Sequence, residues 1–175
     1  MPIKKTTFNR KIARAFTLVE LLLYIGLVGI IMLSVSIFYF ETLQARVKNQ
    51  TVSEVEMQGT LAMEKITQTI RNADVINSPA VGLSAASISL ATITPTTNPT
   101  LFDLSSGILR ITEGANPAVN LTTDKVAVSA LNFQNLSSAS TPGVVKITFT
   151  ITYINNAGRN EYDFSKTFTG AASLR

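Results

Sequence analysis

An uninterrupted apolar run near the N-terminus constrains this chain more than any other feature of its sequence. Residues Leu21–Phe40 contain no charged side chain, and a run of 20 residues is long enough for a helix to cross the hydrocarbon core of a bilayer. Sixteen of the 25 residues in Phe16–Phe40, the apolar segment, are Leu, Ile, Val or Phe. On the insertion scale they contribute about −5 to −9 kcal/mol in total. The apolar segment is therefore predicted to be a membrane-spanning helix.

The net charge of +4 comes from the residues that precede this segment. Residues 1–15 contain five basic side chains and no acid, whereas the other 160 residues contain 10 basic and 11 acidic side chains, a net charge of −1. Because basic flanks stay in the cytoplasm, we expect a cytoplasmic N-terminus and an exported C-terminal part. A general nucleic-acid binder would instead need a basic patch on a folded surface. The basic residues are Lys4, Lys5, Arg10, Lys11 and Arg14.

The residue types that are missing narrow the possible chemistry. The sequence has no Cys, which excludes a disulfide framework, thiol catalysis and cysteine metal sites. It has no His, which excludes a Ser-His-Asp triad and histidine-ligated zinc or haem. No phosphate loop, dinucleotide fingerprint or nucleophile elbow is present, and we predict neither an enzyme activity nor a cofactor or metal. The acids of the C-terminal part are scattered singly, at Asp103, Glu113, Asp124, Glu161 and Asp163.

Two simple interpretations of the apolar segment fit poorly. The core of a cleaved signal peptide has 7–15 residues and ends at an A-x-A-like site, but this run is longer and Leu43-Gln44-Ala45 matches such a site poorly. A plain signal anchor leaves Glu20 unexplained, because an anchor gains nothing from a carboxylate inside its apolar edge.

The junction between the basic stretch and the apolar run is distinctive. It reads Arg14, Ala15, Phe16, Thr17, Leu18, Val19 and Glu20, followed by Leu21 and Leu22. This junction strongly resembles the class III leader of type IV prepilins and type II secretion pseudopilins. The resemblance implies that a prepilin peptidase cuts between Ala15 and Phe16, that Phe16 is then N-methylated, and that the apolar helix stays in the product. Ala15 departs from the family, which usually has Gly before the cut.

The chemistry of Glu20 can also be argued from the residues themselves. After cleavage, Phe16 would carry an amine beside the bilayer, where an unpaired amine and an unpaired carboxylate are both costly. Packed helices could pair Glu20 of one subunit with the Phe16 amine of a neighbour, which would set the axial register of assembly. The alternative is a contact within one chain, because residues four apart share a helix face and the helix dipole favours an acid near the N-terminus.

A helical pattern continues beyond the membrane segment, from Glu41 to Asp74. Proline is absent from residues 3–78, and Gly59 costs about 1 kcal/mol relative to Ala without breaking the pattern. One helix is therefore predicted from Phe16 to about Asp74. Its second half carries a stripe of apolar side chains, which we expect a C-terminal domain to cover. The apolar positions recur mainly at steps of four or seven, at Leu43, Val47, Val55, Ala62, Ile66 and Ile70.

Residues 75–175 are predicted to form an exported, β-rich head. Val144–Ile154 alternates with period two, and a turn at Asn155–Gly158 leads into a second alternating segment at Tyr162–Phe168, which predicts a hairpin. In the predicted strand Lys125–Leu136, one face is assigned Val126, Val128, Ala130 and Asn132, and the other face, less regularly, Ala127, Leu131 and Phe133. The predicted fold class is therefore α+β, with a long N-terminal helix packed on a small antiparallel β-sheet head. This is also the pilin architecture that the resemblance implies.

The function that the resemblance implies is structural: a subunit of a type IV pilus or a type II secretion pseudopilus. Met63–Ala73 resembles the end of the long helix in minor subunits, which favours a minor role. The implied partners are prepilin peptidase, other pilin or pseudopilin subunits, the inner-membrane assembly platform and the lipid bilayer. The implied location is the cytoplasmic membrane, crossed once with the head exported, and then a periplasmic or extracellular filament.

Two other functions remain open. The first is a DNA-uptake or adhesion pilin whose head binds a ligand, and the second is a membrane-anchored exported enzyme. Residues 41–175 contain 10 basic and 10 acidic side chains, so DNA binding would require a local gathering of charge. The basic residues that would have to cluster are Lys146, Arg159, Lys166 and Arg175.

Overall fold

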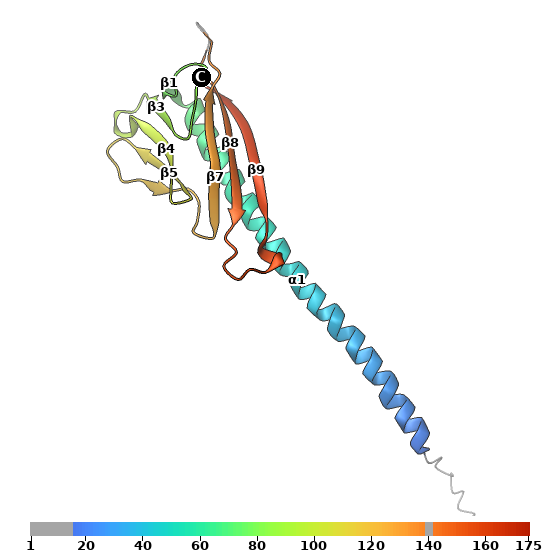
Figure 1. Cartoon of the computed structure of the whole chain (residues 1–175). Coiled ribbons are helices and arrows are strands. Elements are labelled where there is room, and N and C mark those ends of the chain that lie inside the picture. The colour runs from blue at the N-terminus through green and yellow to red at the C-terminus, as the bar shows by residue number, and fades with distance from the viewer. Residues whose placement is uncertain (1–15, 139–141) are drawn as a thin grey trace, which may run out of the picture. The chain divides into compact units, whose positions relative to one another are not determined.

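The computed structural model describes residues 16–138 and 142–175 (Figure 1). The described residues form one long helix, nine strands and two short 3-10 helices. The helix packs on two antiparallel sheets, so the fold is α+β with a single long helix and a β head, as the sequence predicts. The chain divides into two compact units between Leu43 and Gln44, and the second of these, residues 44–175, is called the head unit.

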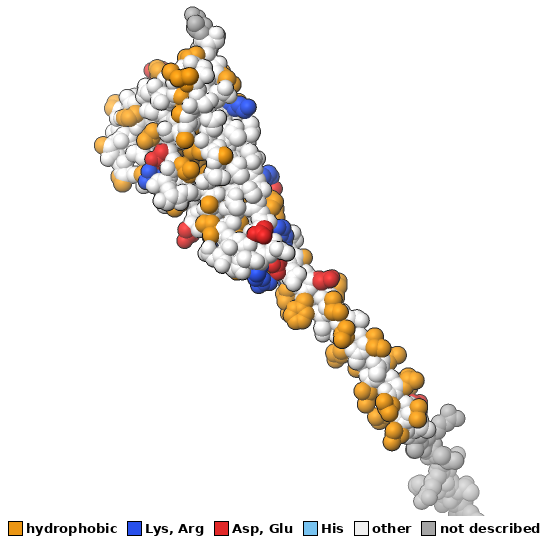
Figure 2. All heavy atoms as spheres, viewed as in Figure 1, with side chains coloured by type: hydrophobic (Ala, Val, Ile, Leu, Met, Phe, Trp, Pro, Cys, Tyr) orange, Lys and Arg blue, Asp and Glu red, His pale blue; other side chains and the backbone are white. Residues whose placement is uncertain are grey.

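Helix α1, Leu18–Arg71, presents different surfaces in the two units. Up to Phe40 its large apolar side chains are all exposed, and Figure 2 shows hydrophobic atoms covering the visible face of this segment. Beyond Gln44 a single stripe is buried. The buried residues are Thr51, Val55, Gln58, Gly59, Ala62, Ile66 and Ile70. The predicted stripe is thus confirmed from Val55 onward, whereas Leu43 is 39% exposed and lies outside the core.

The helix ends three residues before the predicted limit at Asp74. Arg71 is its last residue, and strand β1, Ala73–Ser78, begins almost at once. Strand β1 pairs antiparallel with β3, Ile88–Thr92, and Ala73 is buried in the core. The chain therefore passes almost directly from the helix into a strand that pairs with β3.

Two antiparallel sheets make up the rest of the head unit. The first has the order β1-β3-β4-β5-β6, with β4 at Thr100–Ser105, β5 at Ile108–Glu113 and β6 at Val119–Asn120. The second has the order β2-β7-β8-β9, with β2 at Ser84–Ala85, β7 at Val126–Asn135, β8 at Val144–Tyr153 and β9 at Ser165–Ser173. The 3-10 helices are Pro95–Thr97 and Asn160–Tyr162.

One hydrophobic core joins the second half of α1 to both sheets. Ile66 and Ile70 of α1, Phe102 of the first sheet, and Phe133 and Phe149 of the second are fully buried in it. Full burial of such a side chain contributes about 1.5–3 kcal/mol. The core therefore holds both sheets on a single stripe of the helix.

The structure corrects the predicted faces of the strand at 125–136. Val126 and Val128 share the buried face of β7 with Leu131 and Phe133, whereas Ala130 and Asn132 are exposed. The register with β8 shifts between Ser129 and Asn132, and Ala130 has a positive φ of 51°. This β-bulge adds one residue to the strand, so side chains after it change face.

The β8–β9 hairpin is confirmed, but its second strand begins later than predicted. The sequence predicts a strand over Tyr162–Phe168, whereas β9 begins at Ser165 and extends to Ser173. Tyr162 belongs to a 3-10 helix instead, and its ring stacks on that of Tyr153 with a centroid distance of 5.8 Å. The strand thus starts only after this packed turn.

Gly59 lowers the helix propensity of α1, but its missing side chain makes room for a residue of β9. The ring of Phe168, from β9, lies directly over Gly59, and a Cβ atom at this position would overlap the ring. The same ring stacks on Phe149 at a centroid distance of 5.5 Å, so moving it away from Gly59 would disturb this contact. Gly59 therefore allows β9 to approach α1 closely.

We predict that Gly59→Ala destabilises the full-length protein by about 1–3 kcal/mol, because overlap with the Phe168 ring outweighs the gain in helix propensity of about 1 kcal/mol. Urea unfolding in detergent, followed through the head unit, measures the change. Ser53→Ala, an exposed position on the same helix, is the matched control and should not destabilise. If Phe168→Ala fails to reduce the effect of Gly59→Ala in the double variant, the overlap is not its cause.

Candidate functional site

The site that the sequence singles out begins at the first turn of α1. The hydroxyl Oγ1 of Thr17 accepts a hydrogen bond from the backbone N–H of Glu20 at 3.3 Å, and the Thr17 carbonyl accepts from Leu21 N–H at 3.1 Å. Thr17 is therefore the N-cap of the helix. Our sequence interpretation treated Thr17 only as part of the leader motif, although the spacing Thr-x-x-Glu is the signature of a capping box.

Glu20 lies in the first turn of the helix, where the dipole favours a negative charge. Its side chain is exposed, and within the described residues its carboxylate has no hydrogen bond or ion pair. Phe16 is 67% exposed, and its ring contacts Tyr24 at a centroid distance of 5.8 Å. Of the other motif residues, Leu18 and Val19 are exposed, whereas Arg14 and Ala15 lie outside the described residues.

Three hydroxyl side chains in or just after the apolar segment of α1 bond to the helix backbone. The hydroxyls of Ser34, Ser36 and Thr42 donate to the carbonyls four residues earlier, at 3.0, 2.8 and 2.8 Å. Such internal bonds remove the cost of placing a hydroxyl in lipid. Glu20 differs from these three hydroxyl side chains, because its carboxylate has no hydrogen-bond or ion-pair partner among the described residues.

The apolar part of α1 has the properties of a membrane-crossing helix. An 18-residue window has a mean hydropathy of 2.6, and none of that window is buried in the chain. A Cβ atom at Gly26 or Gly29 would meet nothing within 4 Å. Neither glycine is therefore needed for a contact within the described chain, and both leave room for a second helix to approach.

Asp103 and Glu113 of the head unit each pair with a base. Arg110 binds Asp103 with two hydrogen bonds of 3.0 and 2.6 Å, and this contact raises the pKa of the Arg110 guanidinium. Lys65 Nζ lies 3.7 Å from Glu113 Oε1. No group of three or more metal-binding side chains occurs in residues 16–138 and 142–175. Among the described residues, neither Asp103 nor Glu113 therefore lies beside a second acid with which it forms a pair.

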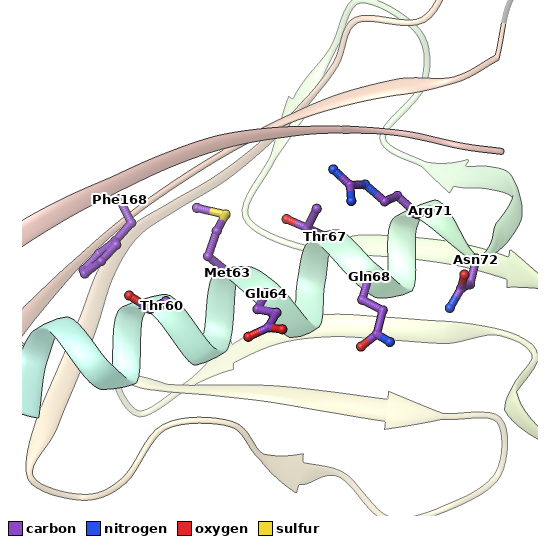
Figure 3. A pocket seen from close by; sticks show the side chains of 8 residues that line it. All are labelled: Thr60, Met63, Glu64, Thr67, Gln68, Arg71, Asn72 and Phe168. Carbon is purple, nitrogen blue, oxygen red and sulfur yellow. The ribbon is translucent and has the colours of Figure 1, made fainter.

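A groove is lined by one face of α1 and by Phe168 of β9 (Figure 3). Met63 and Phe168 form its apolar part, and Met63 lies against Gly170 of β9. Glu64 is the one acid in its lining, and Figure 3 shows its side chain pointing away from Arg71. The groove therefore lacks the two carboxylates that paired acid–base catalysis would need.

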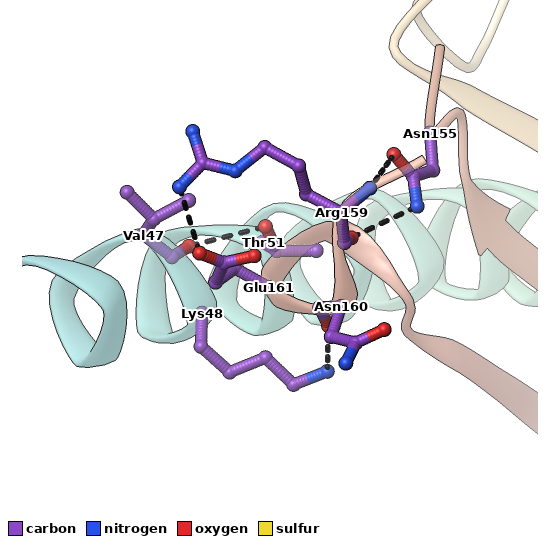
Figure 4. A network of polar contacts seen from close by, with 7 residues as sticks. All are labelled: Val47, Lys48, Thr51, Asn155, Arg159, Asn160 and Glu161. Atoms are coloured by element: carbon purple, nitrogen blue, oxygen red, sulfur yellow. Dashed lines mark hydrogen bonds and ion pairs between the residues drawn. The ribbon is translucent and has the colours of Figure 1, made fainter. Parts of the chain in front are cut away.

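A polar network fastens the β8–β9 connection to α1 (Figure 4). Lys48 Nζ donates to the carbonyl oxygens of Asp163 and Asn160, at 2.5 and 3.4 Å. Within the connection, Asn155 Nδ2 donates to the Arg159 carbonyl at 2.9 Å, and Arg159 Nη2 donates to Glu161 Oε1 at 2.7 Å. The bond from Arg159 is the main reason that the pKa of Glu161 lies below its ordinary value of 4.5.

We predict that acid loosens this connection. The pKa of Glu161 is lower in the folded than in the unfolded chain. Its contribution to the stability of the folded connection is therefore present above about pH 4.5, and it is lost as the pH falls through the pKa of the folded state. Amide hydrogen exchange of residues 154–164 in the full chain, at pH 6 and pH 3.5 and corrected for intrinsic rates, should show this loss. Glu161→Gln should reduce the dependence on pH, and Glu64→Gln, an exposed control, should not. Equal pH dependence in both variants would contradict the assignment.

Comparisons of the chain with protein-family models, with curated proteins and with solved structures give no match. The function therefore has to be argued from the chemistry of the residues described above.

Proposed function

We propose that this chain is the precursor of a structural, non-enzymatic subunit of a type IV pilus or a type II secretion-type pseudopilus. In this proposal a prepilin peptidase cuts between Ala15 and Phe16, and the product assembles through the apolar half of α1. The observation that carries the proposal is the position of Glu20, an acid with no hydrogen bond or ion pair among residues 16–138 and 142–175, at the start of an exposed apolar segment whose serine hydroxyls bond to the helix backbone.

The cut would create the partner that Glu20 lacks. Removal of residues 1–15 leaves a positively charged, N-methylated amine on Phe16, close to the first turn of α1. In a packed group of helices, the Phe16 amine of one subunit and Glu20 of its neighbour would neutralise each other in a medium of low dielectric constant. Breaking such a pair leaves an isolated charge, so the pair favours one axial register.

The basic residues before the cut would keep the N-terminus in the cytoplasm while the head unit is exported. In the membrane the subunit would be held by the lipid bilayer through α1, and it would pass to an inner-membrane assembly platform and to other pilin or pseudopilin subunits. We propose a minor role in the filament, on the resemblance of Met63–Ala73 alone.

A structural role is also supported by the charges of the head unit. DNA binding would require Arg159 and Lys166 to be available, but Arg159 pairs with Glu161 and Lys166 pairs with Glu56, each at 2.7 Å. These ion pairs neutralise the positive charges of two of the four basic residues that would have to cluster in a DNA-binding head. Exposed arginine and lysine without acidic neighbours would have favoured the DNA-uptake alternative.

Mass spectrometry of the protein, produced in a host with a prepilin peptidase, tests the cleavage. We predict a mature chain that begins at Phe16 and carries one added methyl group. Ala15→Gly should give the same product with faster processing, because the residue before the cut then matches the family. Assembled protein that still contains residues 1–15 would refute the proposed cleavage.

Assembly tests the role of Glu20. We predict that Glu20→Gln is cut normally but loses most of its assembly into filaments, since the Phe16 amine of the neighbour is then left without a charged partner. The amount of sheared or sedimented filament measures the effect. Glu64→Gln, an exposed acid of the head unit, should assemble as the native chain does. Normal assembly of Glu20→Gln would mean that the acid does not set the register.

A further inference from the structure

We infer that the filament contains a second ion pair between copies of this chain, in which Glu41 of one copy contacts Arg46 of its neighbour. The inference rests on the proposed function, because it requires parallel α1 helices that pack side by side. The surface involved is the stretch of α1 that directly follows the uncharged run Leu21–Phe40.

Glu41 and Arg46 are both exposed, and neither has a hydrogen bond or an ion pair to any described residue. They cannot satisfy each other within one chain. Five residues correspond to a rotation of about 140° around a helix, so the two side chains leave it in nearly opposite directions. Each charge therefore needs a partner from outside its own chain or remains in solvent.

The neighbouring charges on α1 already have partners in their own chain. Lys48 donates to the carbonyls of Asn160 and Asp163, and Glu56 binds Lys166. Glu54 Oε1 accepts a hydrogen bond from Gln58 at 3.1 Å. Between residues 41 and 56, only Glu41 and Arg46 are left as charges without a described partner, and they have opposite sign.

The axial register required by the first pair also suits the second. If the Phe16 amine of one copy reaches Glu20 of its neighbour, the two copies are displaced by about 6 Å for a fully helical segment. The displacement is about 10 Å if the two residues before Leu18, where α1 begins, are extended. Arg46 lies five residues, or about 7.5 Å, beyond Glu41, which is inside this range.

The direction of the displacement is the same for both pairs. The copy that contributes Phe16 is shifted toward the C-terminal end of its neighbour, and the same copy contributes Glu41. In both pairs the residue with the lower number therefore meets the residue with the higher number on the adjacent helix. The second pair lies at the end of the apolar run, where neighbouring helices exclude water and an unpaired charge is costly. The main effect of the pair between Glu41 and Arg46 is to select the axial register in which neighbouring α1 helices pack.

Cysteine cross-linking tests the pair directly, because the chain contains no cysteine of its own. Full-length Glu41→Cys and full-length Arg46→Cys, produced together, should form a disulfide-linked dimer in assembled filaments. A matched control joins Glu41→Cys with Ser53→Cys, another exposed position on α1, twelve residues or about 18 Å along the helix. The control should give at least about tenfold less dimer, since disulfides require Cα atoms within about 7 Å. Equal yields from both combinations would overturn the inference.

Charge reversal gives an independent readout. Glu41→Arg and Arg46→Glu should each lower the amount of filament by about fivefold or more, and the two reversals in one chain should restore it to within about twofold. If the native chain is cut and assembles but neither reversal has an effect, the second pair is wrong and the proposed function stands. If the native chain is neither cut nor assembled, the proposed function fails and the pair fails with it.

Discussion

The structure depends on one helix that presents two kinds of surface to two kinds of surroundings. Up to Phe40 every large apolar side chain of α1 is exposed, whereas beyond Gln44 a stripe of the helix is buried under the two sheets. A single stripe can hold a domain only if both sheets share it, and Ile66 and Ile70 lie in the core that joins them. The head unit is thus built around part of a helix whose other part is not covered by any of residues 16–138 and 142–175.

The polar groups of α1 follow the same division. The hydroxyls of Ser34, Ser36 and Thr42, in or just after its apolar part, bond to the carbonyl four residues earlier and so need no partner outside the helix. In the head unit, Lys48 reaches backbone carbonyls of the β8–β9 connection, more than 100 residues away in the chain. Glu20, Glu41 and Arg46 belong to neither arrangement, and for this reason the proposals concern other copies of the chain.

Most of the fold could be read from periodicity, and the departures from it have local physical causes. The alternation of Val145, Ile147 and Phe149 predicted the buried face of β8, and these residues are fully buried. The alternation at 125–136 predicted the wrong faces after Ser129, because a β-bulge at Ala130 turns the following side chains to the opposite face of the strand. For the candidate site, Phe16 and Glu20 are recognisable from sequence alone, and so is the capping role of Thr17, which follows from its spacing to Glu20.

The sequence by itself determined the features that depend on neighbours along the chain: the apolar run, the charge asymmetry before it, and the helical and strand periodicities. Only the tertiary structure decided which distant groups meet. Gly59 is read in sequence as a weak point of a helix, yet the Phe168 ring occupies the space that its missing side chain leaves. Lys166 and Glu56, 110 residues apart, form an ion pair because β9 lies against α1. No local pattern encodes such contacts, since they depend on how the sheets fold back onto the helix.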